Sequence, residues 1–501
     1  MVSDSPASSA DRFLSVAHLA QDVERRAARG GIVMIAAQGL RLALQIGSTA
    51  ILARLLTPHD YGLFGMAAVL AGFALLINDL GLNTATVQRA DISIDQVSSL
   101  FWVNLGFSTL CTLVTAASAP LVAKIFDEPA LTWMVMALAP SLLISGAAAQ
   151  HGALLTRQMR FRAIALLDLG SFAAGISAAV VASSLGAGPW SLVAMFLTQP
   201  LVRAASIVAL VPWRPHWHKP GTELRSLLGF GGDVTAFRML AYLSLNADNA
   251  LVGWYSGAVQ LGLYSRGYAL FMSPLSNMLP AVRQVVEPAL SRVQHDRPRY
   301  EQLYGRFEEL LSWLTMPLAM VALFGARPLV RLALGPGWEG VVPVLQLLSV
   351  AAPIQPVMST VSWLFVSAGR TREMLRWGAI STVCHCCAFL LAMPHGAAGM
   401  ALAAGMARLI AAPIGIKMAG SAVGLDVKRL LVSASLPLFA NLAGGLAAMF
   451  VLRVSGLVSP VAQLFVVALF VGGASLAVLL SSGRLAALRE LVLRRPRVAS
   501  T

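Results

Sequence analysis

Five arginines lie inside long apolar segments of the sequence, where a charged side chain is costly. They are Arg41, Arg203, Arg238, Arg266 and Arg408. Arginine at the centre of a bilayer costs about 2.5–3.5 kcal/mol on insertion scales, so we expect these side chains to face a wet cavity or a partner. A guanidinium group can donate two hydrogen bonds to one phosphate or carboxylate group. The chemistry that these residues suit is therefore the binding of a diphosphate or an acidic sugar.

Each arginine could instead be neutralised locally, or reach the membrane surface along its aliphatic stem. The candidate charge partners are Asp79, Asp168 and Asp248, with Asp233 as a fourth. All but Asp248 fall near the predicted inner ends of apolar segments, where water is reachable. Asp248 could bind a coupling ion or a proton, pair with Arg266, or cap the outer mouth. Charge at mid-depth is therefore predominantly positive, which predicts a cationic cavity.

Two further observations argue against a metal site and against ATP hydrolysis. The run Cys384-His385-Cys386-Cys387 has metal-binding residue types, but neighbouring side chains on a helix point about 100° apart, so at most Cys384 and Cys387 share a face. We expect packing residues there, with no metal and no cofactor. No phosphate-binding loop with a Walker signature is present, which argues against ATP hydrolysis.

The elements that must position these side chains are membrane helices. Of the 501 residues, 57% are hydrophobic and 12% charged, against about 25% charged in a typical soluble domain. This composition, with a mean hydropathy of +0.73, excludes a set of separate soluble domains. We expect the net charge of +14 to lie in loops facing the anionic inner leaflet, with no nucleic acid as partner.

Fourteen segments have the length and apolarity of a membrane span, which requires about 20 residues. They are Gly31–Leu56, Tyr61–Leu80, Leu100–Ala123, Leu131–Ala149, Ile164–Leu185, Pro189–Val211, Asp233–Trp254, Leu263–Val282, Leu310–Ala326, Val341–Phe365, Leu375–Met393, Ala397–Ile416, Leu430–Leu452 and Val461–Ser481. With the N-terminus inside, only five basic residues fall in outward loops: Arg54, Lys124, Arg327, Arg331 and Arg453. The positive-inside rule then places both termini in the cytoplasm.

An internal repeat divides these spans. ILARLLTPHDYGLF, from Ile51, and LVGWYSGAVQLGLY, from Leu251, lie 200 positions apart, each between the first and second helix of a six-helix set. Because six is even, the two halves have the same orientation, as in transporters with parallel repeats. We therefore predict an all-α integral membrane protein with about 14 transmembrane helices in two parallel six-helix lobes plus two C-terminal helices. The predicted boundaries are a cytoplasmic tail (1–30), two lobes (31–225 and 226–420), two further helices (421–482) and a basic tail (483–501).

Four strings resemble the polysaccharide-transporter family, the Wzx-type flippases of the multidrug/oligosaccharidyl-lipid/polysaccharide exporter superfamily. They are LARLLTPHDYGLFGMA from Leu52, the stretch DNALVGWYSGAVQLGLYSRGYALFMSPLSNMLPAVRQVVEPALSR from Asp248, RLALGPGWEGVVPVLQLLS from Arg331 and SAGRTREMLRWG from Ser367. The match runs from about Arg29 to Ile416 and looks most like the exopolysaccharide and colanic-acid branch.

The resemblance implies translocation of undecaprenyl-diphosphate-linked oligosaccharide repeat units across the bacterial inner membrane, for exopolysaccharide or lipopolysaccharide biosynthesis. It also implies membrane lipids and a polysaccharide polymerase and co-polymerase as partners, and no enzyme activity. The main alternative is an ion-coupled drug or cation extruder of the same superfamily, which should favour acidic groups at mid-depth. A polytopic glycosyltransferase, polymerase or ligase would need a large periplasmic loop, and the longest one here, from about Arg327 to Gly340, offers only Glu339 as a carboxylate. A purely structural scaffold leaves the buried arginines unexplained.

Overall fold

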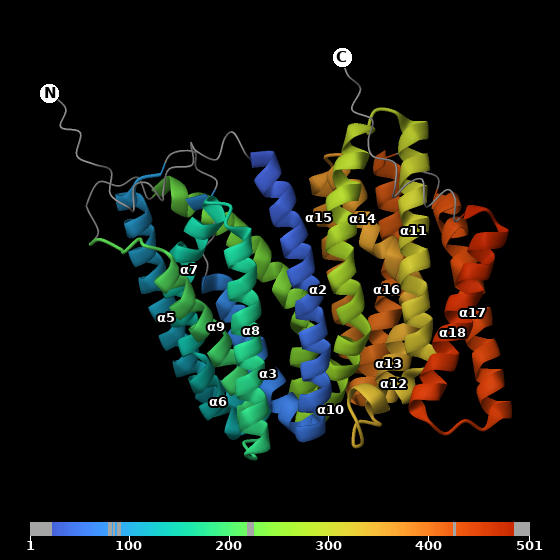
Figure 1. The fold of residues 1–501 in the computed structure, drawn as a ribbon, viewed down its shortest axis with the longest axis horizontal. Helices are drawn as coiled ribbons and strands as arrows, with labels where there is room; N and C mark the ends of the chain where they lie inside the picture. The colour runs from blue at the N-terminus through green and yellow to red at the C-terminus, as the bar shows by residue number, and fades with distance from the viewer. Residues whose placement is uncertain are drawn as a thin grey trace. The chain divides into compact units, whose positions relative to one another are not determined.

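The computed structural model describes residues 23–78, 92–217, 225–423 and 427–484, with Asn83, Thr86 and Val87. Over these residues the chain consists of helices, turns and loops, with no strand (Figure 1). In the same ranges nine helices, or ten with one bent pair, are long and apolar enough to cross a membrane. The all-α membrane class is confirmed, and every predicted range overlaps a helix, but the number fourteen stays a prediction.

The chain divides into two compact units, Met1–Gly262 and Leu263–Thr501. The first contains α2 (Val23–Leu55), α3 (Pro58–Asn78), α5 (Ile94–Phe126), α6 (Ala130–Leu138), α7 (Pro140–Arg157), α8 (Phe161–Ser184), α9 (Trp190–Leu210) and the start of α10 (Arg225–Arg292). The second contains the rest of α10, α11 (Arg297–Phe324), α12 (Ala326–Ala333), α13 (Val341–Val350), α14 (Gln355–Ser367), α15 (Thr371–Ala392), α16 (Gly396–Val423), α17 (Val427–Ser455) and α18 (Pro460–Ser481).

Two breaks interrupt long helical stretches. α10 contains one residue outside the helical region, Gly257, with φ 80° and ψ 177°, which separates the two spans predicted on either side of it. A φ of this sign is open to glycine and unfavourable for residues with a Cβ atom. α13 and α14 meet at an angle of 55° at the segment containing Pro353, a residue that cannot donate the backbone hydrogen bond of a continuous helix. Pro274 and Pro280 lie within α10, where the backbone remains helical.

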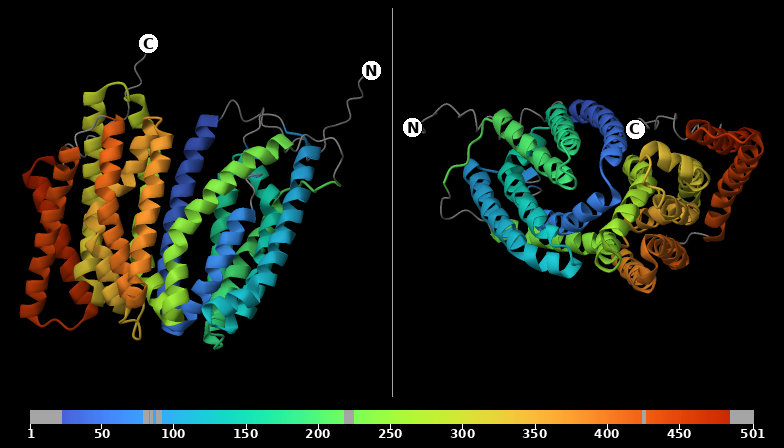
Figure 2. Two further views of the ribbon diagram at one scale, coloured as in Figure 1. Left: turned by 180° about the vertical axis from the view of Figure 1, so that it is seen from behind. Right: turned by 90° about the horizontal axis from the view of Figure 1, so that it is seen from below.

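In the first unit, α8 packs against α2 and α9, and α7 packs against α5 and α9 (Figure 2). α5 begins with a capping box, in which Ser93 and Gln96 each accept a hydrogen bond from the other's backbone N–H. A cluster of buried side chains joins α5, α7, α9 and the segment after α9; it includes Phe101, Leu154 and Trp213. These contacts hold α7 between two neighbours and leave one of its faces to line a cavity.

The two repeated turns pack against each other reciprocally. A Cβ atom at Gly62 would overlap the backbone of Ala258, and one at Gly262 would overlap the backbone of Pro58. Position 58 corresponds to 258 in the repeat, and 62 to 262, so the same pair of positions makes contact twice. Such an exchange is what a two-fold relation between similar elements produces. Glycine permits it because two helix backbones can then touch directly.

In the second unit, two hydroxyl pairs join α11 to α14. The Tyr300 Oη lies 2.6 Å from the Ser367 Oγ, and the Tyr304 Oη lies 2.6 Å from the Thr360 Oγ1. All four groups are buried among the apolar residues of this unit's main core. Buried hydroxyls are costly without partners, so each pair satisfies two of them at once.

Near the C-terminal end of the second unit, α17 packs against α18 and α11. Inside that pair the Ser475 hydroxyl donates to the Asn441 Oδ1 at 2.8 Å, and the Asn441 amide donates to the Pro437 carbonyl at 2.7 Å. Arg484, just after α18, forms an ion pair of 2.6 Å with Glu309 of α11. The last two helices are therefore attached to the rest of their unit by polar contacts as well as apolar ones.

Candidate functional site

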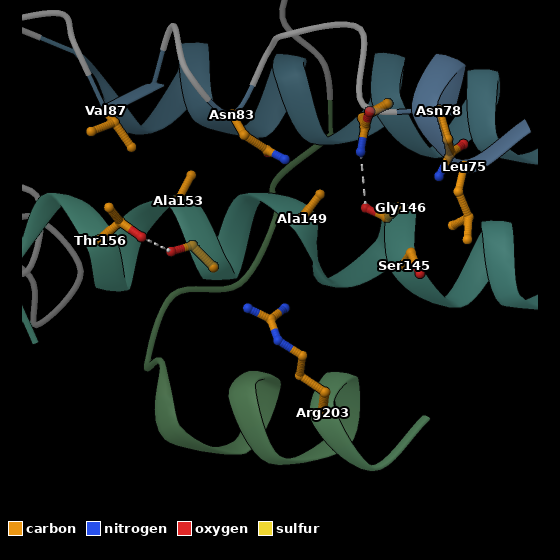
Figure 3. A pocket seen from close by; sticks show the side chains of 12 residues that line it. Leu75, Asn78, Asn83, Val87, Ser145, Gly146, Ala149, Ala153, Thr156 and Arg203 are labelled. Carbon is orange, nitrogen blue, oxygen red and sulfur yellow. Dashed lines mark hydrogen bonds between the residues drawn. The ribbon is translucent and has the colours of Figure 1, made fainter. Parts of the chain in front are cut away.

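An open cavity of about 480 Å³, lined by polar and apolar residues, lies among the helices of the first unit (Figure 3). It is bounded by α3, α5, α7 and α9 and by Asn83 and Val87. Its lining residues are Leu75, Asn78, Asn83, Val87, Asn104, Ser145, Gly146, Ala149, Gly152, Ala153, Thr156 and Arg203. The size is typical of sites for small organic ligands, which span about 300–1,000 Å³.

The face of α7 that lines the cavity is made almost entirely of small residues. Gly146, Ala149, Gly152 and Ala153 recur at helical spacing and leave the backbone close to the open volume. Gly146 also allows α5 to approach, because a Cβ atom there would overlap the Ser108 side chain. The cavity is therefore a consequence of small residues on α7.

Two buried asparagines hold the cavity walls in place. Asn78 of α3 and Asn104 of α5 are 4% and 1% exposed. The Asn78 Nδ2 donates to the Leu142 carbonyl at 2.9 Å, and the Asn104 Nδ2 donates to the Gly146 carbonyl at 3.1 Å. A carbonyl only accepts, so these contacts fix which end of each amide faces α7. The two amides bind α3 and α5 to successive turns of α7.

Arg203 is the one cationic side chain among the described lining residues, and it projects from α9 toward α7 (Figure 3). Its Nε donates to the Asp168 Oδ1 of α8 at 2.8 Å, with the two side chains 38% and 33% exposed. A Cβ atom at Gly152 would lie 4.0 Å from its Nη1, so the guanidinium group lies over the bare surface of α7. The ion pair offsets the arginine charge and leaves its terminal nitrogens on the cavity side.

Arg41 has a different kind of partner. Its Cζ lies 5.1 Å from the centre of the Phe172 ring of α8, in a cation–π arrangement. Phe172 follows Asp168 by one helical turn, so one face of α8 supplies partners to two of the five arginines. The ring carries no charge, so this contact does not offset the positive charge of Arg41.

The other candidate residues are more scattered. Asp248 is 6% exposed on α10 in the first unit, and its Oδ1 accepts from the backbone N–H of Asn249. Arg266 of α10 and Arg408 of α16 are half-buried in the second unit. Asp79 and the side chains of Asp233 and Arg238 lie outside the described residues. Of the nine candidates, the structure brings together Arg203 and Asp168.

Sequence reasoning missed the neutral polar residues of the cavity. Asn104 and Ser145 lie inside predicted spans, as the arginines do, and Gln150 directly follows one, but only charged residues were selected as candidates. Gln150 is fully buried, and its Oε1 accepts from the Thr86 hydroxyl at 2.8 Å. Uncharged amides and hydroxyls in apolar segments were the signal that would have located the cavity.

Fold and site together define a multi-pass membrane protein with a partly polar cavity among its helices. The chain belongs to a polysaccharide biosynthesis protein family, whose model matches residues 51–343, including both copies of the repeated turn. This finding confirms the resemblance to polysaccharide transporters.

Curated relatives carry transport and biosynthesis names. The succinoglycan biosynthesis transport protein ExoT of Rhizobium meliloti is 26% identical over 68% of this chain and 69% of its own length. The lipopolysaccharide biosynthesis protein WzxC of Escherichia coli is 22% identical over 68% of this chain and 70% of its own.

Solved structures show the fold. The inward closed conformation of the lipid II flippase MurJ matches with a TM-score of 0.68, covering 91% of this chain and 100% of that one, at 13% identity. An inward-facing multidrug transporter of the MATE family matches with a TM-score of 0.58 over 75% of this chain and 93% of that one, also at 13% identity. The chain therefore shares its fold with both of these structures.

Proposed function

We propose that the chain flips undecaprenyl-diphosphate-linked oligosaccharide repeat units from the cytoplasmic to the periplasmic leaflet of the bacterial inner membrane. The product serves exopolysaccharide or lipopolysaccharide assembly, with a polymerase and co-polymerase acting afterwards. Membership of the family, and the transport names of relatives such as ExoT and WzxC, support this class of substrate. The fold shared with the lipid II flippase MurJ supports flipping as the mode of transport.

The observation that carries the proposal is the internal cavity with a guanidinium group at its wall. Flipping makes and breaks no covalent bond, so the protein needs only to replace the water that a sugar and a diphosphate lose in crossing the bilayer. Hydrogen-bond donors and acceptors held inside the bundle do this, while the polyprenyl chain stays in lipid. The chain then acts as a transporter and not as an enzyme.

In this mechanism the two lobes alternate between inward and outward access, and Arg41, Arg203, Arg238, Arg266 and Arg408 contribute guanidinium donors to the diphosphate and the sugars of the substrate. Both termini remain in the cytoplasm. Asp79, Asp168 and Asp248 serve as charge partners or take part in ion coupling. Energy comes from an ion gradient or the membrane potential.

A deletion strain carrying a plasmid copy tests the function. Repeat units trapped on the cytoplasmic leaflet in the deletion strain, and moved outward when the plasmid is present, are the expected result. Normal polymer combined with altered drug sensitivity would support the multidrug extruder instead. Normal polymer with unchanged drug resistance would refute both.

A further inference from the structure

The cavity beside Arg203 is polar but close to electrically neutral. Among the lining residues that the structure describes, Arg203 is the only charged one, and Asp168 binds its Nε at 2.8 Å. The remaining polar lining consists of amides and hydroxyls, from Ser145, Thr156 and three asparagines. A diphosphate needs an excess of positive charge, which this cavity lacks.

We propose that this cavity binds an uncharged sugar of the lipid-linked substrate, and that the diphosphate lies elsewhere; this inference rests on the proposed function. A neutral sugar presents hydroxyls that both donate and accept, and such a ligand needs a mixed set of partners. The terminal nitrogens of Arg203 donate, and the Ser145 hydroxyl both donates and accepts. The Thr156 hydroxyl donates to the Gly152 carbonyl at 3.1 Å and can accept from the ligand. The volume of about 480 Å³ accommodates a ligand of this size.

The walls are preorganised for such a ligand. Asn78 and Asn104 each use their amide nitrogen on α7, and each leaves its Oδ1 buried with no hydrogen-bond partner among the described residues. Unsatisfied buried acceptors are uncommon in folded proteins and require an explanation. Both oxygens belong to residues that line the cavity, so they are acceptors available at its wall.

Arg41 provides the contrast. Its described partner is the ring of Phe172, which offsets no charge, whereas Asp168 neutralises Arg203. Arg41 therefore keeps its full positive charge and suits the diphosphate. Asp168 and Phe172, one turn apart on α8, thus give the two arginines different surroundings: the charge of Arg203 is offset by a carboxylate, and that of Arg41 is not.

The test measures binding of three probes to the purified full chain in nanodiscs: undecaprenyl diphosphate alone, the same lipid bearing one neutral hexose, and the same lipid bearing glucuronate. The wild-type protein should bind the hexose lipid more tightly than the bare lipid. Ser145→Ala combined with Thr156→Val should weaken hexose-lipid binding roughly threefold to tenfold, as expected for one or two lost hydrogen bonds, and leave bare-lipid binding unchanged. Asp168→Asn should shift the preference toward the glucuronate lipid, because the positive charge of Arg203 is then no longer offset by a carboxylate.

Thr109→Val is the matched control. Its hydroxyl bonds the carbonyl four residues before it, as that of Thr156 does, but Thr109 is exposed on α5 and does not line the cavity. It should leave all three affinities unchanged. Equal binding of hexose and bare lipid by the wild type would overturn the sugar site and leave the flippase function standing, and so would an equal loss for both lipids in the double variant. Failure of the wild type to bind any of the three lipids would refute the proposed function itself.

Discussion

Gly62 and Gly262, which occupy the same position in the two copies of the repeated turn, each pack against the other copy. Gly62 meets the backbone of Ala258, and Gly262 meets the backbone of Pro58. Each glycine is therefore needed to make room for the backbone of the other copy of the turn, and not for the conformation of its own copy. A second contact links the same helices: the Tyr242 hydroxyl of α10 donates to the Val69 carbonyl of α3 at 3.0 Å.

Substitution of Gly62 or Gly262 by alanine should destabilise the protein by about 1–3 kcal/mol, because the added methyl group overlaps backbone that cannot rotate away. Thermal unfolding of the detergent-solubilised protein measures this. Gly39→Ala and Gly47→Ala are matched controls, since a Cβ atom at either position meets nothing within 4 Å. Equal stability of the Gly62 variant and these controls would contradict the close contact.

Phe172→Leu should lower transport by roughly twofold to fivefold, in line with a cation–π interaction worth about 0.5–1 kcal/mol. Leucine retains the bulk but not the ring face that holds Arg41. Phe172→Trp should restore transport, because indole is the strongest ring partner for a cation. A leucine variant that transports at the wild-type rate would show that the ring only fills space.

Arg41→Ala and Arg238→Ala should leave membrane insertion intact and lower transport, since neither charge is needed for the helices to form. Removing an arginine from an apolar helix makes insertion easier. Expression and fractionation report insertion, while the leaflet location of the repeat unit reports transport. Wild-type transport by a folded Arg41→Ala protein would exclude Arg41 from the substrate path.

Two polar contacts of the last two helices should differ in their effects on stability. Asn441→Ala leaves the buried Ser475 hydroxyl without its partner and should cost about 1–3 kcal/mol. Arg484→Ala breaks a surface ion pair in which the arginine is 40% exposed, so its effect should stay within about 1 kcal/mol. Unfolding of the two variants, measured side by side, distinguishes these cases. A larger loss for Arg484→Ala would mean that the ion pair, and not the buried amide, attaches these helices.

The helices themselves were largely predictable, because a span needs a long apolar run. Their ends were less so. α5 begins at Ile94 and α11 at Arg297, each several residues before the apolar part. There the side chains of Ser93 and Asp296 cap the helix starts, and hydropathy does not register a cap. α2 likewise begins at Val23, within the segment expected to be a tail.

The site was predictable as residue types but not as contacts. Arg203 and Asp168 were both candidates, yet they lie 35 positions apart, and their pairing depends on how α8 packs against α9. Phe172 carried no signal, since phenylalanine is ordinary in an apolar helix. The cavity depends on small residues of α7 facing two asparagines, and that arrangement requires knowing which helices are neighbours.

The two hydroxyl pairs between α11 and α14 fix the position of one helix along the axis of the other. If one helix slid along the other by a single turn, about 5.4 Å, Tyr300 would leave Ser367 and Tyr304 would leave Thr360 in the same step. No intermediate position keeps one hydrogen bond while the other hydroxyl finds a new partner. Even a small displacement of one helix along the other therefore costs free energy. Motion within this unit should therefore occur at helix interfaces that lack such buried hydroxyl pairs, and not between α11 and α14.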